Sequence, residues 1–414
     1  MYRQIIIEPG QRDLQRIVWK SNASEKPSTY RLKTVTYGTT SAPFLAIRTL
    51  QQLASDENSR FPLISEVLLH DTYMDDVVSG APDLVTAKAL QSQLRSALQS
   101  CGMALHKWAS NSGELFNSSL SEEVEHSFSE ATEMAVKTLG ICWRPRQDLF
   151  VFKVAISEKP SYTKREVLSV IARLYDPLGF LGPVVTRAKI LLQRLWQNGI
   201  GWDDTLPDPI KSEWEEFVAT LTCIEAIKID RYVLTDISKR IIIQGFADAS
   251  EAAYGAVAYL QCFYSGEAVK STILASKSRV APIQVISIPR LELCACVLLA
   301  QLVTKIRSCL RCEMDGVMLH SDSTIALAWL KTPANRLKTF IGNRVSKVQQ
   351  LTEDCQWFHV PSALNPADII SRGLDPAELP TSDLWWNGPP FVRQGKMSSE
   401  TSDGFPLEPD AEYS

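Results

Sequence analysis

Four acidic side chains stand at strand ends or helix starts between residues 225 and 374, where the sequence alternates short apolar strands with helices. Two of them end apolar strands, one heads a long apolar helix and one lies in the first turn of the last helix; in that order they are Asp248, Asp322, Glu292 and Asp368. Strand ends and helix starts meet at the edge of a sheet in folds of this pattern. We therefore expect the four side chains to converge.

Converging carboxylates favour metal chemistry. Four of them on one small sheet are suited to bind two Mg²⁺ about 4 Å apart, with Mn²⁺ as the alternative, and to activate a water for attack on a phosphodiester. Acids are also common at helix starts through capping and the helix dipole, and that alternative accounts for any one of them. It does not account for Glu292 among leucines or for an Asp at both strand ends. We expect all four to be catalytic residues and metal ligands.

A second acidic pair, Asp75 and Asp76, lies between two apolar segments in Tyr73-Met74-Asp75-Asp76. Adjacent strand residues point to opposite faces, so both carboxylates reach one metal only at a tight turn. Mg²⁺ prefers oxygen ligands and needs several of them close together. An acidic hairpin turn without a metal remains the alternative at this point.

Tyr73 to Asp76 resembles the catalytic hairpin of retroelement reverse transcriptases. Three other segments resemble the same family in order: one that contacts template and incoming nucleotide, with Gly38, Ser41 and Pro43; the palm segment with Lys107; and Leu139-Gly140, which opens the primer grip. The resemblance implies catalytic and metal-binding roles for Asp75 and Asp76, and nucleotide or nucleic-acid binding by Tyr73, Gly38, Ser41, Pro43 and Lys107. The family's first metal aspartate precedes the equivalent of residue 1. We therefore expect a truncated palm that does not polymerise DNA.

The four later acids stand in the segments F-A-D-A-S, R-L-E-L, H-S-D-S and N-P-A-D-I-I-S-R-G. In this order they resemble the D-E-D-D set of the ribonuclease H domain of LTR retroelements. The resemblance implies a mixed five-stranded sheet with helices and cleavage of RNA in RNA–DNA hybrids. The loop that carries a His in cellular and retroviral relatives is too short here, and we expect His359 to lie in the last strand with a structural role.

A basic stretch follows Asp322, because no acid occurs between Asp322 and Glu353. Its cations are Lys331, Arg336, Lys338, Arg344 and Lys347. A solvated helix face is one interpretation. Beside a phosphodiesterase site we expect these residues to bind the hybrid backbone, with a corresponding sensitivity to salt.

Two further segments, L-W-W-N-G-P-P near residue 386 and L-Y-D-P-L-G-F-L-G-P near 178, resemble BEL/Pao-type retrotransposon Pol polyproteins. The predicted fold is α/β and α+β. It comprises a truncated reverse-transcriptase palm with primer-grip strands (1–150), a helical thumb or connection (151–224), the ribonuclease H-like domain (225–375) and an acidic Pro/Ser-rich tail or linker (376–414). The implied partners are RNA–DNA hybrid, primer–template, and the integrase and fingers of the polyprotein. The implied location is intracellular, in cytoplasmic virus-like particles and in the nucleus.

Composition narrows the alternatives only partly. The net charge of −4 neither demands nor excludes a nucleic-acid partner. The sequence has no run of about 18 apolar residues that would predict a membrane span. Its nine irregularly spaced cysteines favour reduced thiols over a zinc site. Two other functions stay open: a fragment that only binds nucleic acid, and an aspartic peptidase. The peptidase needs Asp-Thr/Ser-Gly, which neither Asp71-Thr72-Tyr73 nor Asp322-Ser323-Thr324 supplies.

Overall fold

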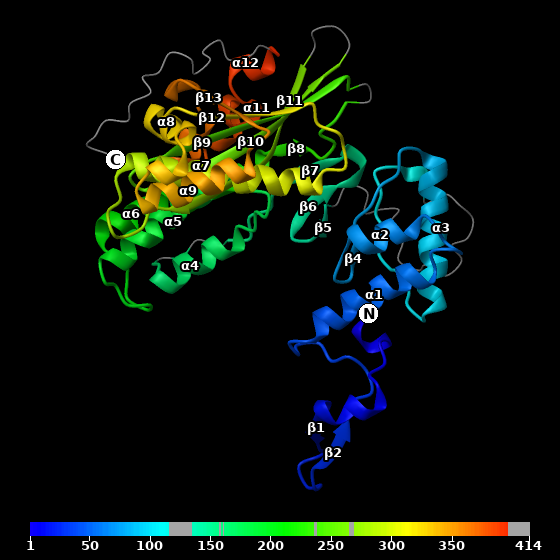
Figure 1. Cartoon of the computed structure of the whole chain (residues 1–414). Coiled ribbons are helices and arrows are strands. Elements are labelled where there is room, and N and C mark those ends of the chain that lie inside the picture. Colours follow the sequence, from blue (N-terminus) through cyan, green and yellow to red (C-terminus); the bar gives the residue numbers. More distant parts are fainter. Residues whose placement is uncertain (116–134, 157–158, 160, 236–237, 265–268, 396–414) are drawn as a thin grey trace. The chain divides into compact units, whose positions relative to one another are not determined.

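The computed structural model describes residues 1–115, 135–156, 159, 161–235, 238–264 and 269–395 (Figure 1). The chain forms two compact units. Met1–Leu139 and Arg144–Gln147 form the first, and Gly140–Trp143 with the chain from Asp148 onward forms the second. We describe each unit by itself.

The first unit is mainly helical. Its elements are η1 (Tyr2–Gln4), η2 (Pro9–Gln15), β1 (Arg16–Trp19), β2 (Ser28–Arg31), α1 (Ala42–Asp56), α2 (Ile64–His70), β3 (Thr72–Tyr73), β4 (Asp76–Val77), α3 (Leu84–Ser100), η3 (Gly113–Leu115), β5 (Val136–Thr138) and η5 (Pro145–Gln147). Helices α1, α2 and α3 share a small core that includes Leu50, Ile64 and Leu94. At the start of α3, the Asp83 carboxylate accepts a hydrogen bond from the Thr86 N–H, which satisfies a helix donor that would otherwise be unpaired.

The second unit is built on the mixed five-stranded sheet that the sequence predicts, in the order β11-β10-β9-β12-β13. Its strands are β9 (Arg240–Ala249), β10 (Ala253–Phe263), β11 (Val269–Val280), β12 (Gly316–Ser321) and β13 (Gln356–His359). The first three form an antiparallel meander. Strands β12 and β13 run parallel to β9, so the carboxyl ends of β9 and β12 lie at the same edge of the sheet.

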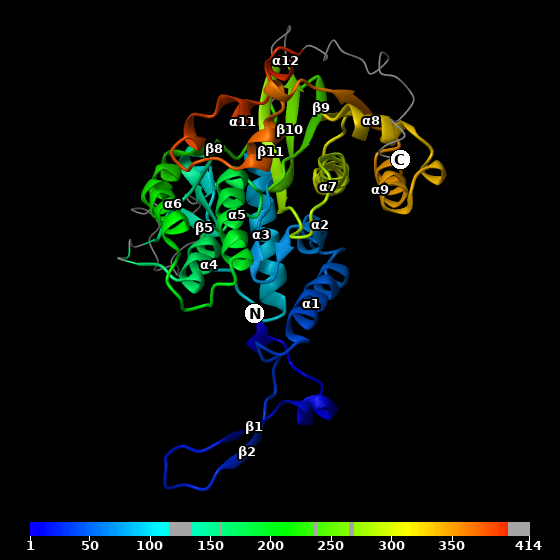
Figure 2. The same cartoon turned by 90° about the vertical axis from the view of Figure 1, so that its left-hand side faces the viewer.

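Helices cover both faces of this sheet (Figure 2). On one face pack α7 (Ile288–Cys309), α8 (Thr324–Lys331), η7 (Ala334–Arg336) and α9 (Thr339–Leu351). The other face is covered by α5 (Gly182–Gln197) and α10 (Pro366–Arg372), together with the C-terminal residues described below. In the described part of the chain no helix is long and apolar enough to cross a membrane.

The segment predicted as a separate thumb or connection shares one core with the sheet. Helices α4 (Lys164–Arg173), α5 and α6 (Asp208–Thr220), with η6 (Leu221–Ala226), pack around fully buried Trp214 and reach Phe246 and Tyr259 of the sheet. Strands β6 (Ile141–Arg144), β7 (Leu149–Val151) and β8 (Lys228–Asp230) precede and follow these helices, and β7 pairs with β8. The predicted boundary at residues 224/225 therefore falls inside one packed unit.

The prediction of a tail is wrong for residues 376–395. This C-terminal strap (residues 374–395) contains η9 (Leu379–Thr381), α11 (Asp383–Asn387) and α12 (Pro390–Arg393). Trp385 is fully buried, and its indole N–H donates to the Phe180 carbonyl at 3.0 Å. The prediction was based on the Pro, Ser and acidic residues of this segment. It did not take into account the large apolar side chains that complete the core of the second unit. Residues 396–414 lie outside the described part.

Candidate metal centre

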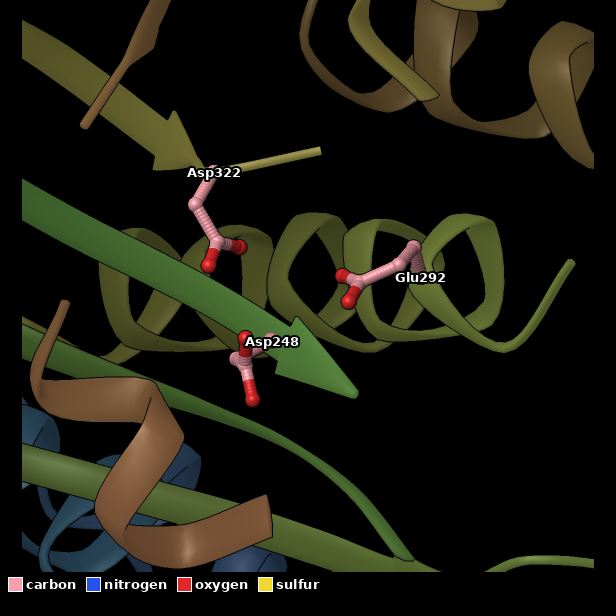
Figure 3. A group of neighbouring side chains, drawn as sticks. All are labelled: Asp248, Glu292 and Asp322. Atoms are coloured by element: carbon pink, nitrogen blue, oxygen red, sulfur yellow. The ribbon is translucent and has the colours of Figure 1, made fainter. Parts of the chain in front are cut away.

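Three of the four predicted acids meet at the sheet edge. Asp248 lies near the end of β9, Glu292 in the second turn of α7 and Asp322 directly after β12. One oxygen from each carboxylate lies within 4.8 Å of the others. Figure 3 shows the three side chains pointing into the space between the strand ends and the helix. Asp248 and Glu292 are buried, with exposed fractions of 3% and 6%, whereas Asp322 is half-buried.

The local sequence explains this convergence. Strands β9 and β12 are parallel neighbours, with Ser321 opposite Ala247, so the residue after each partner reaches the same edge. Helix α7 begins with Pro289 in its first turn, as a helix start favours. Buried Leu291 and Leu293 flank Glu292, and they hold the start of the helix against the sheet so that the acid faces the strand ends.

The environment of these acids fits a divalent cation. Burial, reinforced by the neighbouring carboxylates, raises the pKa of Asp248 to about 7 and that of Glu292 to about 9. Glu292 Oε2 is buried and has no hydrogen-bond partner. Burying carboxylates without a compensating charge is costly, and a cation held by oxygen ligands would supply that charge. The three acids form the donor set that Mg²⁺ prefers.

The fourth predicted acid, Asp368, lies outside this group of three. It stands in the first turn of α10, and its Oδ1 accepts from Arg372 Nε at 2.6 Å. Its charge still raises the pKa of Asp248 and Glu292, so it lies near enough to influence them. The role of Asp368 as a metal ligand stays a prediction.

Sequence reasoning missed the hydroxyl groups that contact the two aspartates. The Ser371 hydroxyl donates to Asp248 Oδ2, and the Ser362 hydroxyl donates to Asp322 Oδ2. Both serines flank Asn365, which caps α10 because its side chain accepts a hydrogen bond from the Ala367 N–H. The segment N-P-A-D-I-I-S-R-G contained the signal for Ser371, because its serine is one helix turn from the predicted ligand.

The surroundings of the acids are open and partly basic. A shallow hollow of about 290 Å³ is lined by Ile288, Pro289, Glu292 and Asp322–Ile325. The five cations predicted to bind nucleic acid lie on α8, η7 and α9 or just before α9: Lys331, Arg336, Lys338, Arg344 and Lys347. All are exposed except Arg344, which is half-buried, lies 3.5 Å from the Phe340 ring centroid and donates to Cys294 Sγ.

In the first unit, Tyr73 pairs with Asp76 across the predicted hairpin, which is confirmed as β3 and β4. Asp75 and Asp76 are exposed, and Met74 between the two strands has φ +58°. The other residues assigned nucleic-acid roles there are also exposed: Gly38, Ser41, Pro43, Tyr73 and Lys107. The roles of all these residues stay predictions. His359 lies in β13, in the strand where the sequence predicts it.

The sheet, its flanking helices and the acids at its edge define a ribonuclease H-like domain. Residues 163–323 match the model of one family, the Pao retrotransposon-like RNaseH-like domain, so this part of the chain is similar to that family. The match includes Asp248, Glu292 and Asp322 and ends before Asp368. It begins at Thr163, inside the predicted thumb, in agreement with the core that α4–α6 share with the sheet.

A solved structure extends the likeness beyond this region. The foamy viral protease-reverse transcriptase, whose structure was determined in complex with RNA/DNA hybrid, is 11% identical with a TM-score of 0.52. The match covers 87% of this chain and 43% of that chain, so this chain spans less than half of the viral protein. At this identity the likeness shows the fold alone. No curated protein matches the chain.

Proposed function

We propose that the second unit is a metal-dependent ribonuclease that cuts the RNA strand of RNA–DNA hybrids. One observation carries the proposal: three carboxylates from β9, α7 and the end of β12 converge, and a buried oxygen of one of them, Glu292, has no hydrogen-bond donor. Such a set favours a cation over a purely structural role, because structural buried acids are normally paired. The ribonuclease H-like family match supports the same chemistry.

The acids have related tasks in this proposal. Buried Asp248 and Glu292 would hold a cation together with half-buried Asp322, and Glu292 and Asp322 also line the hollow. Bound Mg²⁺ would supply an activated water and stabilise charge on the leaving oxygen. Asp368, now paired with Arg372, would join as a fourth ligand when it leaves that ion pair.

The basic stretch from Lys331 to Lys347 would bind the sugar–phosphate backbone of the hybrid. Four of its five cations are exposed, and two of these, Lys331 on α8 and Lys347 on α9, lie on helices that contact α7. The solved viral relative was determined with an RNA/DNA hybrid, which supports the same partner here. Each phosphate contact should add to the salt dependence of binding.

For the first unit we infer that primer extension is absent or crippled. Two-metal phosphoryl transfer uses several carboxylates, and within the described residues Asp75 and Asp76 belong to no group of three acids with ligand spacing. The remaining polyprotein partners, and a location in cytoplasmic virus-like particles and the nucleus, are part of this proposal. Clear primer extension by the chain on a primed RNA template with dNTPs and Mg²⁺ would overturn this inference.

The ribonuclease proposal is tested with a labelled RNA–DNA hybrid and Mg²⁺. We expect the chain to cut the RNA strand, the chelator EDTA to stop it, and Asp248→Asn to abolish it. The matched control is Glu251→Gln, which changes an exposed acid in the turn after β9 and should cut normally. Tight hybrid binding without cleavage would instead establish a binding module, and chelator-insensitive self-cleavage would point to a peptidase.

A further inference from the structure

Each aspartate at the strand ends has one oxygen held by a serine hydroxyl. Ser371 holds Asp248 and Ser362 holds Asp322, both through Oδ2. The two serines come from one short stretch of chain, residues 362–371, that includes η8 (Ser362–Leu364) and α10. An ionised carboxylate has about four acceptor sites, so a hydroxyl on one oxygen orients the group and leaves the other oxygen available.

Ser371 is placed for this contact by its own burial. It is fully buried in α10, and its carbonyl accepts from the Ser250 hydroxyl at 2.8 Å. Its hydroxyl also lies 3.1 Å from the Asp368 carbonyl. A hydroxyl carries one proton, and an ionised carboxylate is a stronger acceptor than a backbone carbonyl, so we assign the proton to the contact with Asp248.

Asn365 fixes the stretch between the two serines. It is fully buried, and its side-chain amide donates to the Ala247 carbonyl at 3.1 Å, one residue before Asp248. The same nitrogen lies 3.4 Å from Asp322 Oδ1. The stretch is therefore tied to β9 directly beside one acid and contacts the other acid, so its position and that of the two carboxylates are linked.

We propose that Ser371 and Ser362 are positioning residues, which fix Asp248 and Asp322 through one oxygen each so that their other oxygens face Glu292 around a cation. The inference rests on the proposed function, because it assigns the serines to the same metal centre. Hydrogen bonds of this kind to metal-binding side chains are commonly worth about 10–100-fold in metal affinity or activity. Neither serine touches the bound metal in this arrangement.

The test measures metal binding to the full chain without substrate, by titration calorimetry with Mg²⁺ and with Mn²⁺. Ser371→Ala and Ser362→Ala should each weaken binding by about 10-fold or more. Ser362→Thr should restore near-normal affinity, because residue 362 is exposed and threonine keeps the hydroxyl. Ser308→Ala is the matched control: its hydroxyl is exposed near the C-terminal end of α7 and contacts only Lys305 and Cys309, and its metal affinity should stay within about 2-fold of the parent.

Cleavage of the hybrid at increasing Mg²⁺ gives an independent readout. The serine variants should need about 10-fold more Mg²⁺ for half-maximal rate and approach the parent rate at saturation. Parent-like metal affinity in both alanine variants would overturn the positioning role while leaving the ribonuclease proposal intact. Equal weakening by Ser308→Ala would overturn it too. If the parent chain binds no metal and cuts no hybrid, the proposed function itself has failed.

Discussion

Replacing Trp385 by Ala tests whether the C-terminal strap belongs to the core of the second unit. The indole is fully buried and donates to the carbonyl of Phe180, two residues before α5 begins. The backbone carbonyl of Trp385 accepts from the Tyr259 hydroxyl at 2.7 Å, so the strap is tied to β10 as well. Trp385→Ala removes the first of these hydrogen bonds and leaves a large cavity.

The expected loss of stability follows from these contacts. Truncating a buried Trp to Ala typically costs about 3–5 kcal/mol, and leaving the Phe180 carbonyl without its donor adds about 1 kcal/mol. The sum, roughly 4–6 kcal/mol, is a large part of the 5–15 kcal/mol that holds an ordinary domain together. We therefore expect Trp385→Ala to remove a large part of the free energy of unfolding of the second unit.

Urea denaturation followed by far-UV circular dichroism measures this loss as a fall in the midpoint of the transition. Hydrogen exchange of β10 peptides then assigns the transition to the second unit. Trp19→Ala serves as control, since that side chain is 60% exposed and should change the free energy of unfolding by under about 0.5 kcal/mol. A Trp385→Ala variant that unfolds at the parent midpoint would refute the packing of the strap.

Three other variants probe the site and its support. The pKa of Glu292 is raised to about 9, so its contribution to the stability of the metal-free protein is present at low pH and is lost as the pH rises toward about 9. Thermal melts in EDTA should show this loss of stability with rising pH, and Glu292→Gln should make the loss smaller. Thr163→Ala breaks the capping box of α4 and should cost about 1 kcal/mol, read from urea titrations. Gly255→Ala would place a Cβ 2.5 Å from Ile370 Cγ2, and we expect the free energy of unfolding to fall by about 1–3 kcal/mol in the same titrations. Because Ile370 precedes Ser371, calorimetry should also show weaker metal binding.

The convergence of three acids could be predicted because it depends on simple local rules. A carboxylate after an apolar strand lies at the sheet edge, and two such strands in parallel bring their acids together. Glu292 stood out because a charged residue among leucines needs a reason to be buried. Two helix caps follow equally local patterns: Thr163 with Glu166 at the start of α4, and Asn365 before Pro366 at the start of α10.

Other features depend on contacts between distant segments, which single-sequence patterns do not encode. The strap contains more Pro, Ser and acids than large apolar residues, yet Leu379, Trp385 and Val392 are fully buried. Sequence patterns also do not decide whether Asp368 pairs with Arg372, as it does here, or binds a cation from solution. The boundary at residue 225 marks a change in sequence pattern, and that pattern does not reveal the core that Trp214 shares with Phe246.

The candidate metal centre also depends on helix α5 and the strap, which contribute no acid to it. Helix α10, which carries Asp368 and Ser371, packs on α5 and on the strap as well as on the sheet. Gly373 ends it in the left-handed region at φ +80°, where a Cβ would lie 3.0 Å from the Arg187 backbone nitrogen of α5. The ion pair between Arg187 and Asp375, at 3.7 Å, continues this contact into the strap. Acids at a metal site must be held in place before the cation arrives. Helix α5 and the strap support α10 and so belong to the same structural unit as the acids, and the family match from Thr163 includes helices α4–α6.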